Sequence, residues 1–196
     1  LTVTNSGTLT IADTTGPADT ATVDIDLDGA FTQDGAGGVS IAGEITTTAD
    51  DVAFNGAVSL TGAVAMDTAV GIGDITFSST VDGGQPLSLT AGSGNVVIPS
   101  AVGGGTRLGA LTIASAVNVA GNAGATADTG TITAATVTQT AGTGTSRFAQ
   151  IDTNAAGGVD LNGAAFALNG GVTTTAGGAL TVTNSGTLTI ADTTGP

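Results

Sequence analysis

Three aspartates at alternate positions are the residues of this chain most suggestive of chemistry. Asp24, Asp26 and Asp28 are followed by Gly29 and, two positions later, by an apolar Phe31, in the stretch VDIDLDGAF. Oxygen ligands at positions 1, 3 and 5 and glycine at position 6 match the first half of a calcium-binding loop. The match fails at position 12, where Gly35 stands in place of the bidentate glutamate and Asp34 comes one residue early.

The same stretch has the pattern of a β-strand. Val23, Ile25 and Leu27 alternate with the aspartates, which places three apolar side chains on one face and three carboxylates on the other. Alternate side chains on a strand lie ~6.8 Å apart, too far to share one ion as a loop does. We expect a strand whose apolar residues point into the core, whose aspartates face water, and which turns a corner at Gly29. We therefore predict no specific metal site.

Other catalytic chemistry is poorly represented. The chain lacks His, Cys, Lys and Tyr, so the usual pairs of a nucleophile and a base cannot be built. Carboxylate pairs such as Asp50 and Asp51, or Asp24 with Asp26 or Asp28, could serve a glycosidase. A sugar-binding groove would usually offer aromatic platforms, and Trp and Tyr are both absent. We predict no enzyme and no cofactor, and assign no catalytic or cofactor-binding residue.

Charge restricts the partners. Arg107 and Arg147 are the only basic side chains against 16 acidic ones, a net charge of −14. Neutralising nucleic-acid phosphates needs a basic patch, so nucleic acid is not expected as a partner. No apolar run approaches the ~18 residues of a membrane span, so membrane insertion is not expected. Diffuse binding of divalent cations is expected, because it would reduce self-repulsion.

An exact duplication organises the chain. Residues 1–17 and residues 180–196 both read LTVTNSGTLTIADTTGP, so the offset is 180 − 1 = 179. We interpret 1–179 as one tandem repeat unit and 180–196 as the start of the next identical unit. The chain starts without methionine or a signal segment, and we expect it to be an interior part of a longer protein. The expected partner is the chain itself, through head-to-tail continuation of repeats; lateral bundling of fibres is left open.

A shorter period lies within the unit. Pairs of apolar residues two positions apart recur, and nine steps between chosen pairs span the unit, at about 20 residues each. The chosen pairs begin at Leu1, Val23, Val39, Val58, Ile75, Val96, Val117, Val137, Val159 and Leu180. Short strands separated by Gly and Asn-Gly corners predict an all-β chain, either a parallel β-helix of about nine rungs, which we favour, or an array of β-sandwiches.

Threonine pairs raise one more alternative. Thr-x-Thr recurs, for example at Thr2/Thr4, Thr8/Thr10 and Thr173/Thr175, and flat threonine ladders on solenoids can order water as ice-binding surfaces do. Threonine is also favoured on any exposed strand. One predicted rung after Thr2/Thr4 come Asp24/Asp26, which would break the ladder. We therefore attribute the Thr-x-Thr pairs to exposed strands rather than to an ice-binding surface.

Two stretches resemble a known family. GDITFSSTVDGGQPLSLTAGSGNVVIPSAVGGGTRLGALTIASA (residues 73–116) and FTQDGAGGVSIAGEITTTADDVAFNGAVSLTG (residues 31–62) are similar to repeats of filamentous-haemagglutinin-like and other giant surface proteins of Gram-negative bacteria. The resemblance implies a right-handed parallel β-helix that is exported across the outer membrane. It also implies an extracellular or cell-surface location and a role in adhesion or in filaments.

The leading functional hypothesis is a structural repeat of a very long secreted β-solenoid that forms an extracellular or cell-surface fibre or stalk. The first alternative is an adhesin segment that binds a surface or a glycan. A carbohydrate-active β-helix enzyme and an ice-binding solenoid are the remaining alternatives, and we expect neither.

Overall fold

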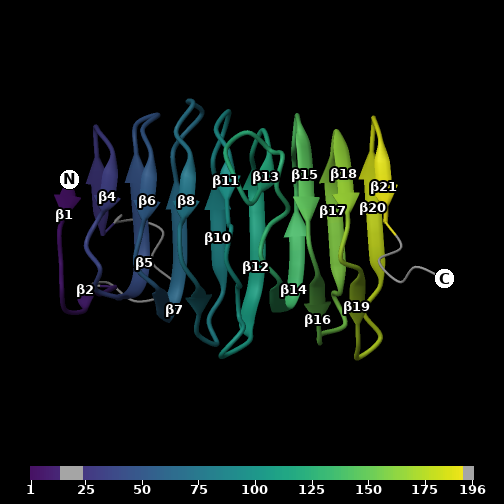
Figure 1. Cartoon of the computed structure of the whole chain (residues 1–196), viewed down its shortest axis with the longest axis horizontal. Coiled ribbons are helices and arrows are strands. Elements are labelled where there is room, and N and C mark those ends of the chain that lie inside the picture. Colours follow the sequence, from purple (N-terminus) through teal and green to yellow (C-terminus); the bar gives the residue numbers. More distant parts are fainter. Residues whose placement is uncertain (14–23, 192–196) are drawn as a thin grey trace.

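The chain is a stack of parallel β-strands (Figure 1). The computed structural model describes residues 1–13 and 24–191, and in these ranges the chain forms strands and no helix. Every strand pair is parallel. Accordingly, the described ranges contain no helix that could cross a membrane. The predicted parallel β-solenoid is confirmed, and the sandwich alternative is excluded because its sheets are antiparallel.

One face of the solenoid is a nine-stranded sheet that takes one strand from each turn. In spatial order its strands are β1 (Thr2–Val3), β4 (Phe31–Gln33), β6 (Val52–Phe54), β8 (Ile75–Phe77), β11 (Val96–Val97), β13 (Val119–Ala120), β15 (Thr145–Phe148), β18 (Ala165–Leu168) and β21 (Leu188–Ile190).

The other strands form a twelve-stranded sheet with two arms. We call the part that follows each strand of the nine-stranded sheet the first arm; it contains β2 (Leu9–Ile11), β9 (Val81–Asp82), β16 (Ile151–Thr153) and β19 (Val172–Thr174). The second arm contains β3 (Ile25–Leu27), β10 (Leu87–Thr90), β17 (Val159–Gly163) and β20 (Leu180–Asn184). Four longer strands complete the sheet: β5 (Val39–Thr47), β7 (Val58–Asp67), β12 (Leu108–Ser115) and β14 (Ile132–Gln139). Each turn therefore has three faces.

The strand order gives eight complete turns and the first strand of a ninth. We expected about nine rungs within the repeat unit, and the structure has about eight turns. The chosen apolar pairs do not lie on one face, because Ile75 belongs to the nine-stranded sheet, Val58 to the first arm and Val159 to the second. Several of the steps we counted are therefore less than a whole turn. A pattern of period two marks a strand, but it does not say which face the strand occupies.

The core lies between the three faces and is built from rows of stacked side chains. In the nine-stranded sheet Val52, Ile75, Val96 and Val119 follow one another in register, all fully buried. In the second arm a parallel row runs through Ile45, Met66, Leu89 and Ile113. Like residues stack on like because each turn presents its inward side chains directly above those of the turn before.

Phenylalanines lie within this core. The rings of Phe54 and Phe77 stack at 5.7 Å with 7° between their planes, and the ring of Phe31 tilts against Phe54 at 5.3 Å. The remaining two, Phe148 and Phe166, are also fully buried. All five phenylalanines of the chain therefore serve packing, and none forms an exposed platform.

Corners use glycine for two different reasons. Gly83 has a φ of +117°, a backbone conformation that glycine adopts without a steric penalty. Gly56 has no positive φ, but a Cβ at this position would lie 2.1 Å from the carbonyl oxygen of Gly37 in the neighbouring turn. Its Asn-Gly sequence therefore reflects the close approach of two turns rather than a hairpin. Ala49 and Ala69 also take positive φ values, of 65° and 59°.

Candidate functional site

The aspartates of VDIDLDGAF are arranged mainly as the strand interpretation predicted. Ile25 and Leu27 pack against the core from β3, while Asp26 and Asp28 are exposed. Asp24 differs, because it is half-buried and its Oδ2 accepts a hydrogen bond of 3.1 Å from the backbone N–H of Glu44. Val23 lies outside the described residues.

Gly29 lies in the bend between β3 and β4, as predicted, but neither backbone strain nor crowding requires glycine there. Its φ is not positive, and a Cβ would meet nothing within 4 Å. Asp34 lies beyond the bend, exposed, where its Oδ1 accepts a hydrogen bond of 2.6 Å from Thr4. Across residues 1–13 and 24–191 the fold brings no three acidic side chains together as a metal site.

A ladder of Asp and Asn side chains links five turns, and sequence reasoning did not find it. The Oδ1 atom of Asp51 accepts from the N–H of Asp74 at 2.8 Å, and Oδ1 of Asp74 accepts from both the backbone N–H and the side-chain amide of Asn95, at 2.7 and 2.9 Å. The amide of Asn118 then donates to Oδ1 of Asn95 at 2.8 Å, and its own Oδ1 accepts from the N–H of Thr145. Each side chain thus satisfies backbone or side-chain groups of the adjacent turn.

The ladder gives Asp51 a structural role. Asp50 and Asp51 were the carboxylate pair we considered for glycoside hydrolysis. Asp51 instead begins the Asp/Asn ladder, and the backbone carbonyl of Asp50 accepts a hydrogen bond from the hydroxyl of Thr47. In the sequence, each ladder residue stands directly before the first core residue of a strand, at Val52, Ile75, Val96 and Val119. An Asp or Asn at this position was the sequence signal for the ladder. It can be recognised only when the register between the strands is known.

A buried glutamine fastens three successive turns at another corner. The Nε2 atom of Gln33 donates to Oδ1 of Asn5 at 2.6 Å and to the carbonyl oxygen of Gly35 at 2.7 Å. Its Oε1 accepts from the N–H groups of Asn55 and Gly56, at 3.1 and 2.8 Å. The side chain is fully buried. These hydrogen bonds compensate for burying the Gln33 amide, because a buried amide without partners is costly.

Both arginines act as clamps between turns. The guanidinium of Arg107 donates to the carbonyl oxygens of Ala134 and Asp152, at 3.0 and 2.8 Å, and pairs with the Asp152 carboxylate at 2.8 Å. Arg147 lies 3.2 Å from Oδ1 of Asp128, measured from its Nε. The only two basic side chains are therefore engaged within the solenoid, and they add no basic patch to its surface.

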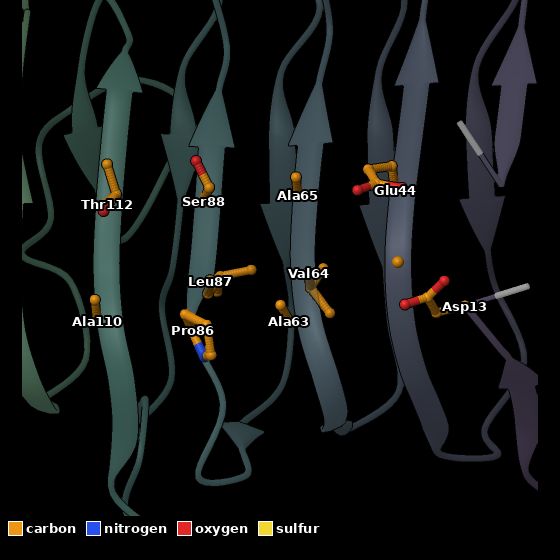
Figure 2. Close-up of a pocket in the computed structure, with 11 residues that line it drawn as sticks. Asp13, Glu44, Ala63, Val64, Ala65, Pro86, Leu87, Ser88, Ala110 and Thr112 are labelled. Atoms are coloured by element: carbon orange, nitrogen blue, oxygen red, sulfur yellow. The ribbon is translucent and has the colours of Figure 1, made fainter. Parts of the chain in front are cut away.

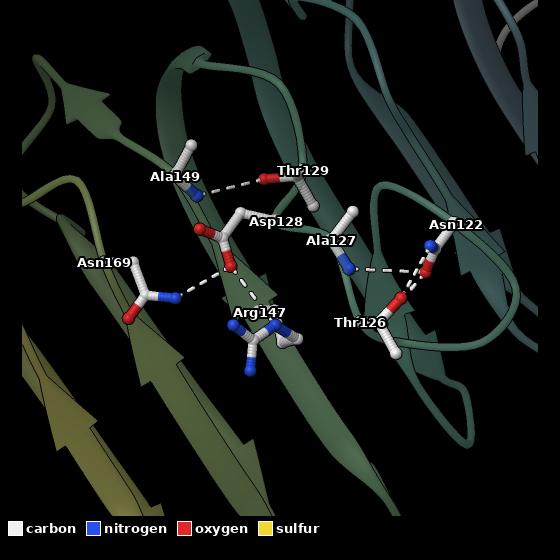
Figure 3. A network of polar contacts seen from close by, with 8 residues as sticks. All are labelled: Asn122, Thr126, Ala127, Asp128, Thr129, Arg147, Ala149 and Asn169. Atoms are coloured by element: carbon white, nitrogen blue, oxygen red, sulfur yellow. Dashed lines mark hydrogen bonds and ion pairs between the residues drawn. The ribbon is translucent and has the colours of Figure 1, made fainter.

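The Arg147 clamp belongs to a polar network around an enlarged corner (Figure 3). Oδ1 of Asp128 also accepts from the side-chain amide of Asn169 at 2.7 Å, so this carboxylate joins two neighbouring strands. On the other side of the corner, Oδ1 of Asn122 accepts from the N–H of Thr126 at 2.9 Å. The network holds residues 121–130 against the stack. This corner belongs to the turn between Val119 and the facing Ser146, which is longer than every other turn except the first.

A groove of about 200 Å³ crosses the second arm (Figure 2). Asp13 and Glu44 lie at one end, and Ala110 and Thr112 lie at the other, with Pro86 between them. The acidic end disfavours anionic ligands such as phosphates. The lining supplies hydroxyls, carboxylates and apolar groups but no histidine, cysteine or lysine, since the chain has none.

Within residues 1–13 and 24–191, the threonines do not form one continuous ladder. On the outer side of the nine-stranded sheet Thr2 pairs with Thr32, but Thr32 then pairs with Ala53. In the first arm Asp152 stands between Thr133 and Thr173. The Thr-x-Thr pairs are thus distributed over different faces and interrupted by other residues.

Comparison with known proteins identifies no relative. No protein-family profile, no curated protein and no solved structure matches this chain.

Proposed function

We propose that the chain is a structural repeat of a very long secreted β-solenoid, which forms an extracellular or cell-surface fibre or stalk. The observation that carries the proposal is the duplication of residues 1–17 at 180–196, in a fold that grows by adding one parallel turn to the last. A solenoid turn contacts only its neighbours, so identical units can be added without any new type of contact.

The two ends of the stack support head-to-tail continuation. Leu1 is 56% exposed at one end, and Leu180 and Ile190 are 41% and 64% exposed at the other. Leu180 pairs with the buried Val159 and Ile190 with the buried Leu168, and Leu1 directly precedes Thr2, which pairs with Thr32. A further turn would cover these side chains and pair the strand edges, which otherwise favour aggregation.

The surface chemistry fits an exposed stalk. Both arginines pair with aspartates inside the stack, so most of the 16 acidic side chains have no basic partner. A strongly acidic surface keeps long fibres apart and attracts divalent cations diffusely. Neither nucleic acid nor a membrane is part of this proposal.

The proposal is tested with chains of one, two and three copies of residues 1–179. Eight turns at ~4.8 Å predict that each copy adds ~38 Å to the length of a folded rod. Electron microscopy and small-angle scattering measure this increment. Deleting one whole copy should shorten the rod by one step and leave it folded, whereas loss of folding or compact particles of constant length would overturn the proposal.

An adhesin segment is the second candidate, and one corner favours it. Val70 and Ile72, between β7 and β8, are 92% and 78% exposed. Two apolar side chains at a corner tip could contact a surface or a glycan. Binding of the isolated chain to immobilised glycans or cells, lost in the double variant Val70→Ser and Ile72→Ser, would support this candidate. Binding unchanged in the variant, or none in the original chain, would remove it.

A further inference from the structure

The duplicated segment occupies two different places in the solenoid. Near the start of the chain, β1 (Thr2–Val3) lies in the nine-stranded sheet against β4, and β2 (Leu9–Ile11) lies in the first arm against β5. In the second copy, β20 (Leu180–Asn184) lies in the second arm against β17, and β21 (Leu188–Ile190) lies in the nine-stranded sheet against β18. The first strand of the segment therefore lies in the nine-stranded sheet in one copy and in the second arm in the other, and the second strand lies in the first arm and in the nine-stranded sheet, respectively.

The segment itself folds in the same way in both places. The side-chain amide of Asn5 donates to the carbonyl oxygen of Gly7 at 2.6 Å, and the amide of Asn184 donates to that of Gly186 at 2.7 Å. In both copies this corner joins one short strand to the next. Local sequence therefore fixes a strand–corner–strand unit, and the turn on which it stacks decides its face.

Turn length distinguishes the two placements. The first turn is the longest, because Thr2 faces Thr32 and the two positions differ by 32 − 2 = 30. In the seven later turns the positions of facing residues differ by 20 to 27. If Leu9 faced Phe31 in place of Leu1, the difference would be 31 − 9 = 22, within that range. Eight turns would then run from Leu9 to Leu188, and 188 − 9 = 179 is the spacing of the duplication.

The placement seen for residues 1–11 does not fit a junction between two copies. In a continuous chain residue 180 is residue 1 of the next copy, so the two placements exclude each other at a junction. Extending the first placement would put Leu180 against Phe166, a difference of only 180 − 166 = 14, which is shorter than any of the described turns. It would also break the pairing of β20 with β17, which runs from Val159↔Leu180 to Gly163↔Asn184.

A similarity between the two halves of the segment makes the shift feasible. Leu1-Thr2-Val3 and Leu9-Thr10-Ile11 have the same alternation of apolar and hydroxyl side chains. Asp13 follows Ile11 at the same distance as Asn5 follows Val3. After a shift of eight positions, a carboxylate oxygen of Asp13 would stand where Oδ1 of Asn5 now accepts from Gln33. Register is weakly specified when both alternatives bury equivalent side chains.

We propose that a preceding copy shifts residues 1–11 by eight positions, so that Leu9–Ile11 cover Phe31–Gln33 and Leu1–Val3 cover Val159–Leu161 of that copy. This inference rests on the proposed tandem solenoid. Its consequence is that each copy contributes eight whole turns. Every corner, including the exposed Val70 and Ile72, then recurs on the same edge of the fibre once per copy, every ~38 Å.

Disulfide trapping tests the shift, because the chain has no cysteine of its own. Facing residues in neighbouring strands lie close enough for a disulfide. The pair Thr2→Cys with Thr32→Cys reports the placement seen here, and the pair Thr10→Cys with Thr32→Cys reports the shifted one. In the chain of residues 1–196 we expect only the 2/32 disulfide. In a chain with residues 1–179 fused before residues 1–196, we expect only the 10/32 disulfide in the downstream copy.

A junction pair separates the two proposals. Ala167 faces Thr189, which corresponds to Thr10 of the next copy (189 − 179 = 10), so in the two-copy chain Ala167→Cys of the upstream copy with Thr10→Cys of the downstream copy reports whether the stack crosses the junction. Peptide mapping by mass spectrometry after oxidation identifies each disulfide. A 2/32 disulfide that persists in the two-copy chain, with rod length still increasing by one step, overturns the shift and leaves the fibre proposal standing. A missing junction disulfide in a rod that does not lengthen overturns both.

Discussion

The side-chain amide of Asn118 donates a 2.8 Å hydrogen bond to Oδ1 of Asn95, one turn earlier in the solenoid. Asn118 also accepts from the backbone N–H of Thr145 in the following turn. One side chain therefore connects three turns. A turn of a solenoid contacts only its neighbours, so such hydrogen bonds add to the strand pairing and the stacked core rows that join adjacent turns.

Replacing Asn118 by alanine is expected to lower the free energy of unfolding by ~1–3 kcal/mol, because it leaves partly buried hydrogen-bonding groups of two turns without partners. The measurement is urea denaturation followed by circular dichroism. Asn162→Ala is the matched control, since Asn162 is exposed on β17. Equal midpoints for the two variants would show that the Asp/Asn ladder does not stabilise the stack.

Replacing Phe77 by alanine is expected to destabilise the chain by ~3–5 kcal/mol, because it removes a fully buried ring stacked on Phe54 and leaves a cavity. Thermal and urea denaturation measure the loss. Val70→Ala removes apolar carbon from an exposed corner and should change stability by less than ~0.5 kcal/mol. A mild effect of Phe77→Ala would mean that the core closes around the missing ring.

Gly56→Ala should destabilise the solenoid by roughly 2 kcal/mol or more, because the new Cβ would collide with the carbonyl oxygen of Gly37 in the adjacent turn. Gly84→Ala is the control, since a Cβ there meets nothing within 4 Å and φ is not positive. It should be neutral or slightly stabilising. The two denaturation midpoints should differ clearly, and coincident midpoints would contradict the close approach of the turns.

Calcium is expected to bind weakly and without a fixed stoichiometry, because Asp26 and Asp28 are exposed and the described residues gather no three acidic groups. Isothermal titration calorimetry should show a shallow, salt-sensitive curve that Asp26→Ala leaves almost unchanged. The matched control is Asp160→Ala, another exposed strand aspartate. Tight one-to-one binding that is lost only in Asp26→Ala would instead support the interpretation of this segment as a calcium-binding loop.

Much of the fold was predictable from the sequence because its signals are local. Apolar residues two apart mark strands, and small corner residues that recur with a regular period indicate stacking in one direction. The strand assignment of Ile25–Leu27 followed from this alternation alone, and the structure confirms it. Composition likewise shows the acidic charge and the scarcity of basic side chains, and residues 1–17 and 180–196 show the duplication without any fold.

The face that each strand occupies was decided only by the tertiary structure. An apolar–Thr–apolar strand fits any of the three faces, as the identical residues Leu1–Val3 and Leu180–Val182 show by lying in different sheets. The choice depends on the neighbouring turn, which is distant in sequence. The eight turns, the Asp51–Asn118 ladder and the buried Gln33 all follow from that choice. A pattern of period two fixes which side chains face inward, and only stacking fixes what each of them meets.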